Sequence, residues 1–159
     1  MVDENLVDQE GVTALEYCIL NNQVDLVKTL IENGDDVNRI INRTSSYLIT
    51  AATSGHSVIV KILLENGANP DFSNHAGRTS LYCAVYYKHR ETVRELIDGG
   101  ADVNKVDIWG QTPLHIACKS AQGDIMNMLI KAGANVNRQD ENGMTPLMCL
   151  YEDIADVYF

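Results

Sequence analysis

Hydrophobic residues recur along the chain in pairs of short segments, and the pairs follow one another at a fixed interval. A leucine heads the first segment of each pair, and these leucines stand 33 residues apart: Leu15, Leu48, Leu81, Leu114 and Leu147. Two residues before each leucine stands threonine or serine, both good helix N-caps. Since the apolar positions within each segment have helical spacing, the pattern predicts a repeated unit of two short helices.

The clearest copy of this unit runs from residue 110 to 142. Thr112 is placed to cap a first helix beginning at Pro113, where a missing N–H costs nothing. We expect this helix to break near residues 121–123, and a second helix to follow with apolar residues at helical spacing, namely Ile125, Met126, Leu129 and Ile130. Gly133 then ends the second helix in the left-handed conformation. The segment 134–143 should project as a β-hairpin-like finger.

One position between the two helices requires attention, because it calls for a positive φ. It is filled in successive copies by Asn22, Gly55, Lys88 and Ala121. Asparagine and glycine adopt positive φ readily, whereas lysine and alanine do so at a cost. We therefore expect this turn to be strained or reshaped in the third and fourth copies.

Two phrases of the fourth copy resemble a known family. Thr112-Pro113-Leu114-His115-Ile116-Ala117 and Gly133-Ala134-Asn135-Val136-Asn137 are similar to the signature of the ankyrin repeat, and the 33-residue period agrees. The resemblance implies an all-α repeat solenoid: a stack of helix-turn-helix units with β-hairpin-like fingers. It implies one array over residues 1–159, divided into a leading finger (1–10), four full repeats (11–43, 44–76, 77–109, 110–142) and a truncated fifth (143–159).

The second repeat and the two ends depart from this pattern. Thr44, Ser46 and Tyr47 stand where the family pattern has Gly, Thr and Pro, so we expect the finger there to be less regular than the others. The first residues align with the middle of a finger, and the last with the first helix of a repeat. Either the chain is a fragment of a longer protein, or its C-terminal tail folds back as a cap.

Composition narrows the class of partner and the compartment. The net charge of −10 argues against nucleic acid as a partner, because such binding requires cationic side chains. No apolar run approaches the ~20 residues needed to span a bilayer, so no membrane association is expected. The four cysteines show no C-x-x-C spacing, which favours a reduced, cytoplasmic protein, with the nucleus as an alternative. We expect a monomer.

The histidines do not indicate an active site. His56 and His89 are one period apart, and His115 belongs to the Thr-Pro-Leu-His phrase, so all three are interpreted as structural. His75 lies on a predicted finger and is available to a partner. No spacing of His, Cys, Asp or Glu suggests three or four convergent metal ligands. The sequence predicts no catalytic residues, no metal, no cofactor and no enzyme activity.

The resemblance implies that fingers and first helices line a concave groove in which a partner protein binds. Carried over by register, the candidate partner-binding residues are Arg43, His75, Arg78, Tyr86, Tyr87, Ile108, Trp109, Gln111 and Lys119. We expect the four large apolar members of this set to form one cluster with Arg78 and Lys119 at its edge. The cations favour a partner segment that carries carboxylates. The alternative for Trp109 is that it only stacks on the neighbouring finger.

The resemblance also implies a range of roles. These are the substrate-recognition part of a ubiquitin-ligase adaptor, a stand-alone inhibitor of kinases or Rel-family factors, a pathogen protein that intercepts host factors, and a regulatory domain of a larger enzyme or channel. Some ankyrin repeats are substrates of an asparaginyl hydroxylase. The asparagines that match in spacing, each after a valine and with a leucine upstream, are Asn38, Asn104 and Asn137.

Overall fold

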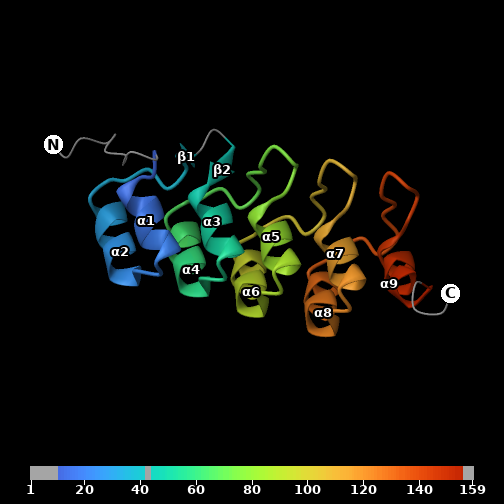
Figure 1. The fold of residues 1–159 in the computed structure, drawn as a ribbon. Coiled ribbons are helices and arrows are strands. Elements are labelled where there is room, and N and C mark those ends of the chain that lie inside the picture. Colours follow the sequence, from blue (N-terminus) through green and yellow to red (C-terminus); the bar gives the residue numbers. More distant parts are fainter. Residues whose placement is uncertain (1–10, 42–43, 156–159) are drawn as a thin grey trace.

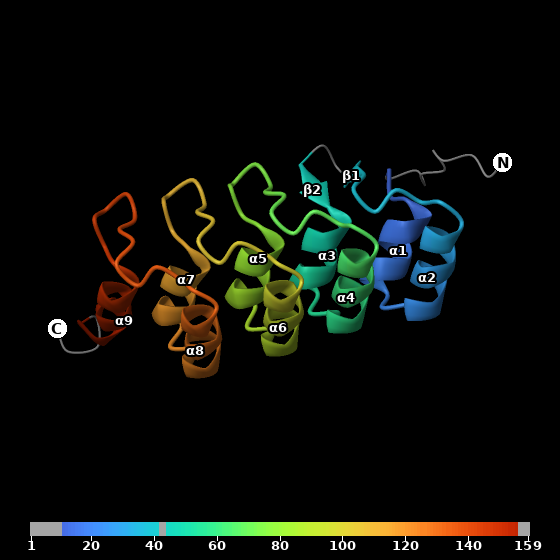
Figure 2. The same ribbon diagram turned by 180° about the vertical axis from the view of Figure 1, so that it is seen from behind.

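In the computed structural model, which describes residues 11–41 and 44–155, short helices pair and the pairs stand side by side in one row (Figure 1). The first helices of the pairs are α1 (Ala14–Leu20), α3 (Tyr47–Thr53), α5 (Ser80–Tyr86) and α7 (Pro113–Lys119). Their partners are α2 (Val24–Glu32), α4 (Ser57–Glu65), α6 (Arg90–Asp98) and α8 (Gly123–Lys131). The last described helix, α9 (Pro146–Ala155), packs beside α7. The predicted all-α solenoid is confirmed, and Figure 2 shows the same row from behind.

The predicted N-caps determine where the first helices begin. The side chains of Thr13, Ser46, Thr79 and Thr112 each accept a hydrogen bond from the backbone N–H three residues later. At α7 the cap is reciprocal, because the Nδ1 of His115 accepts from the N–H of Thr112. Each such cap contributes about 1 kcal/mol to helix stability.

The turn between the two helices has the same geometry in all four pairs. Its φ is 54° at Asn22, 74° at Gly55, 62° at Lys88 and 48° at Ala121. The prediction left strain or reshaping open for the third and fourth copies. The structure retains the left-handed residue in both, so Lys88 and Ala121 carry local strain of roughly 1–2 kcal/mol each.

The fingers differ in how their two sides pair. β1 (Ile40–Ile41) and β2 (Ser45–Ser46) form an antiparallel pair in the finger before α3. We expected this finger to be less regular than the others. It nevertheless contains β1 and β2, which are the paired strands of the described part of the chain. The later fingers close instead through hydrogen bonds such as Asp107 N–H to the Gln111 carbonyl, at 3.0 Å.

Neighbouring fingers are held in register by backbone contacts between them. The Ile108 N–H donates to the Ala76 carbonyl at 3.1 Å, and the Glu141 N–H donates to the Trp109 carbonyl at 3.0 Å. The approach at Gly77 is so close that a Cβ there would lie 2.9 Å from the Cα of Asp107. The fingers from residue 74 onward therefore form one continuous surface.

The core is a seam shared between neighbouring helix pairs. The leucine column illustrates its dependence on neighbours, since Leu15, Leu48, Leu81 and Leu114 are at most 2% exposed. Leu147 occupies the same position in the sequence pattern but is 59% exposed, because no described element packs on the far side of α9. The exposure of a repeat position thus depends on the elements that pack against it and not on the residue alone.

Candidate functional site

Three side chains lie along one face of α5, beginning at the base of the finger that precedes this helix. Arg78 precedes the helix, and Tyr82 and Tyr86 follow at intervals of four residues, which places all three on the same face. The Cζ of Arg78 lies 5.2 Å from the ring centroid of Tyr82 and 5.9 Å from that of Tyr86. The guanidinium is therefore in cation–π contact with both rings.

Trp109 reaches the same guanidinium from the next finger. The Cζ of Arg78 lies 5.4 Å from the centroid of its indole ring. The Trp109 backbone is held on both sides, because its N–H donates to Oδ1 of Asp107 and its carbonyl accepts from the N–H of Glu141. Even so, 47% of the residue remains exposed. We refer to Arg78, Tyr82, Tyr86 and Trp109 as the Arg78 cluster.

This arrangement corrects the predicted position of Arg78. We expected it at the edge of an aromatic cluster, but it is the group that joins Trp109 to the tyrosines of α5. The alternative prediction for Trp109 is partly right, since the ring does stack on Arg78 of the neighbouring finger. Nearly half of the residue nevertheless remains accessible to a partner.

Tyr82 is a member of the cluster that the sequence analysis missed. It is only 3% exposed and occupies the repeat position that His115 fills in the next copy. Burial raises the pKa of its phenol well above the ordinary value, and the nearby Asp107 carboxylate raises it further, while Arg78 opposes both. Nε of Arg78 and Oδ2 of Asp107 are each shielded from solvent without a hydrogen-bond partner. The 33-residue register could have identified Tyr82 as an inward-facing substitute for histidine.

Tyr87 and Ile108 extend the exposed apolar surface beyond the cluster. Tyr87 makes an edge-to-face contact with Tyr86, with the ring centroids 5.1 Å apart, and stacks on His89 at 6.2 Å. Tyr87 and Ile108 are 52% and 53% exposed. Of the four residues that we expected to gather, Tyr86, Tyr87 and Trp109 lie together around Arg78, and Ile108 adjoins Trp109 in the sequence.

The remaining predicted site residues have different surroundings. His75 is exposed on its finger, and Lys119 is half-buried at the end of α7. The side-chain amide of Gln111 donates to Oδ2 of Asp140 at 3.2 Å, so it braces the next finger. Arg43 lies outside the described residues.

The three asparagines proposed for hydroxylation are all exposed but differ in their contacts. The side chains of Asn38 and Asn104 each donate to a glycine carbonyl of the following repeat and accept from a backbone N–H there. Each of these two side chains therefore bridges two repeats. Asn137 makes no such bridge to any described residue. Its backbone N–H donates a hydrogen bond to Oδ1 of Asn135.

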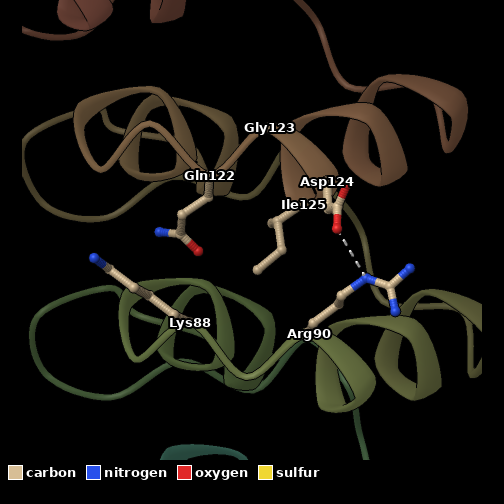
Figure 3. A pocket seen from close by; sticks show the side chains of 6 residues that line it. All are labelled: Lys88, Arg90, Gln122, Gly123, Asp124 and Ile125. Atoms are coloured by element: carbon tan, nitrogen blue, oxygen red, sulfur yellow. Dashed lines mark ion pairs between the residues drawn. The ribbon is translucent and has the colours of Figure 1, made fainter.

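A separate depression of about 400 Å³ lies where the helix-helix turns of the third and fourth repeats meet (Figure 3). Its lining residues are Lys88, Arg90, Gln122, Gly123, Asp124 and Ile125. Nε of Arg90 pairs with Oδ2 of Asp124 at 3.5 Å. This depression lies at the ends of α5 and α7 that are remote from the fingers. None of the predicted site residues lines it.

The described residues offer little for chemistry. In that part of the chain no group of three His, Cys, Asp or Glu side chains is placed to hold a metal ion. All four cysteines are buried and free, and burial raises the pKa of Cys118 to about 11, with Cys149 adding to the effect. A thiol with so high a pKa stays protonated at neutral pH and is a poor nucleophile. No described helix is long and apolar enough to cross a membrane.

The stacked helix pairs, the fingers and the exposed aromatic surface define a repeat solenoid of the protein-binding class. A family model described as ankyrin repeats (3 copies) matches residues 40–107 and 99–154, and a model of a single ankyrin repeat matches residues 10–39. The chain therefore belongs to the ankyrin-repeat family. No curated protein matches it closely. Ankyrin repeats are typically non-catalytic modules that bind other proteins.

Proposed function

We propose that this ankyrin array binds a partner protein on the surface formed by the Arg78 cluster together with Tyr87 and Ile108. The observation that carries the proposal is the exposure of large aromatic side chains on a rigid support: Tyr86, Tyr87 and Trp109 are 51%, 52% and 47% exposed. Tryptophan, tyrosine and arginine are the residues most enriched at binding hot spots. Rings already held by stacking lose little conformational entropy when a partner covers them.

The proposed activity is recognition alone, without catalysis. Within that class we favour an adaptor or scaffold that presents a partner to another protein, such as the substrate-recognition part of a ubiquitin-ligase adaptor. The alternatives are a stand-alone inhibitor, host-directed or endogenous, and a regulatory domain of a larger enzyme or channel. The four free, buried cysteines support a reducing compartment, cytoplasmic or nuclear.

The test begins with affinity capture and mass spectrometry to identify a partner, followed by measurement of its Kd. We expect Trp109→Ala or Tyr87→Ala to weaken binding at least about tenfold, which is about 1.4 kcal/mol, with unchanged helical circular dichroism. Val58→Ala is the matched control, because Val58 is a similarly exposed apolar residue (55%) on α4.

Two outcomes would contradict the proposal. If Trp109→Ala lowers the melting temperature but leaves Kd unchanged, the indole serves only to stack on Arg78. If Val58→Ala weakens binding as much as Trp109→Ala, the partner binds another face of the array.

A further inference from the structure

We infer that Arg78 is the specificity-determining residue of this surface and that it binds the side-chain carboxylate of an Asp or Glu within an extended segment of the partner. This inference rests on the proposed function and adds to it the chemistry of the partner. Three observations support it. Aromatic rings hold the guanidinium in place, its Nε is shielded from solvent so that only the terminal N–H groups remain for a ligand, and no described acid forms an ion pair with it.

The guanidinium is held in place before any partner arrives. Rings from two separate elements, the helix α5 and the finger carrying Trp109, lie within 5.9 Å of its Cζ. An exposed arginine normally loses considerable rotamer freedom when it binds a ligand. Arg78 has already lost most of that freedom through folding, so an ion pair made there retains more of its interaction energy.

The N–H groups of Arg78 that remain for a ligand are those of the two terminal nitrogens. Nε is shielded from solvent and has no hydrogen-bond partner, although the residue as a whole is only half-buried. The Cζ of the cation lies over three aromatic rings, and its N–H groups point outward in the guanidinium plane. Two parallel N–H groups at the end of a guanidinium match the two oxygens of a carboxylate.

No described acid forms an ion pair with Arg78 in the free protein. The described ion pairs join Arg90 and Arg94 to Glu91 and Asp124, and none involves Arg78. The Asp107 carboxylate acts on the same Tyr82 hydroxyl as Arg78 without forming an ion pair with that arginine. Its Oδ1 already accepts the backbone N–H groups of Trp109 and Gln111, which fixes that carboxylate in the finger.

The surroundings favour an internal acidic side chain in the partner over a phosphate group or a chain terminus. The Arg78 cluster contains one cation, whereas recognition of a dianionic phosphate group typically uses a cluster of arginines. Exposed rings lie on both the helix side and the finger side of Arg78, at Tyr86 and Trp109. A segment continuing past the acid in both directions would cover both rings with its neighbouring side chains.

The experiment selects peptides from a random library on the whole chain, with the peptides displayed so that their C-termini are blocked. We expect Asp or Glu to be enriched at one fixed position beside apolar residues. Binding of the selected peptides is then measured by isothermal titration calorimetry, because the Trp109→Ala variant lacks the single tryptophan of the chain. Each peptide is compared with its amide version, in which the acid is replaced by Asn or Gln.

A double-mutant cycle decides the result. Arg78→Gln should weaken the acidic peptide about tenfold or more, and the amide peptide should bind the two proteins equally. Arg94→Gln, which removes an exposed arginine on α6, should change neither affinity. Arg78→Lys, which keeps the charge and the alkyl stem, should weaken the acidic peptide by less than Arg78→Gln, and it replaces that variant if the latter does not fold.

The outcomes separate this inference from the proposed function. The inference is overturned, and the proposed function stands, if the selected peptides lose affinity with Trp109→Ala but carry no Asp or Glu at a fixed position. The same conclusion follows if the double-mutant cycle shows no coupling between the peptide's acid and Arg78. Phosphorylated or free C-terminal versions that bind better than the internal acid would also overturn it. Peptides that bind equally well to Trp109→Ala, or a library that gives no binder, would contradict both.

Discussion

Asn104 offers a direct test of how neighbouring repeats hold together. Its side-chain amide donates to the Gly133 carbonyl at 3.1 Å, and its Oδ1 accepts the Asn135 N–H at 2.7 Å. Both partners belong to the start of the following finger. Asn104→Ala removes both hydrogen bonds and leaves a carbonyl and an N–H that only water can satisfy.

The expected loss follows from the two bonds and their exposure. A typical hydrogen bond contributes about 0.5–1.5 kcal/mol net, and an exposed one lies in the lower half of that range, so the pair is worth about 1–2 kcal/mol. For a domain of this size that corresponds to a fall in Tm of roughly 2–4 °C per kcal/mol. The array itself contains an intermediate case. Asp71, in the same column, makes only the accepting contact, from the Asp102 N–H at 2.9 Å. Asn104→Asp should therefore lose about half as much stability as Asn104→Ala.

The assay is urea unfolding followed by far-ultraviolet circular dichroism and by the fluorescence of Trp109. Asn137→Ala is the matched control, because Asn137 is exposed, also follows a valine, and bridges to no described residue. We expect that control to change the free energy of unfolding by less than about 0.5 kcal/mol. If Asn104→Ala and Asn137→Ala cost the same, the side-chain bridges do not couple the repeats and the reasoning is refuted.

Three further predictions concern pH, local opening and modification. Burial lowers the pKa of His115 below its ordinary 6.5. The unfolded chain therefore binds more protons than the folded one as the pH falls from about 6.5 to the lower pKa of the folded state, and stability falls over that interval. His115→Gln should flatten the pH dependence of the urea midpoint, whereas parallel profiles would contradict this. Amide hydrogens of α9 should exchange much faster than those of α5 and α7, because α9 lacks a described neighbour on one side; equal protection would show that it is capped. If the asparaginyl hydroxylase acts on this chain, mass mapping should find Asn137 modified before Asn38 and Asn104, whose bridges must open first, and the reverse order would count against that argument.

The sequence alone determined the repeat and most of the local structure. The 33-residue leucine column with its preceding Thr or Ser predicts where each first helix begins, because capping and helical periodicity are local properties. The turn column predicted the positive φ, and the structure retains it even at Lys88 and Ala121. The register also identified the region of Tyr86, Tyr87 and Trp109, since stacking at a fixed period places equivalent positions on one surface.

Only the tertiary structure decided which side chains meet across repeats. Leu147 has the same sequence context as Leu114, yet one is 59% exposed and the other 2%, because burial depends on a neighbouring element and not on the residue. The bridge made by Asn104, which Asn137 makes to no described residue, depends in the same way on the neighbouring repeat. Arg78 and Trp109 are 31 residues apart, and the register brings their fingers together without specifying side-chain directions. Their contact exists because finger-to-finger hydrogen bonds and the close approach at Gly77 bring the indole within reach of the guanidinium.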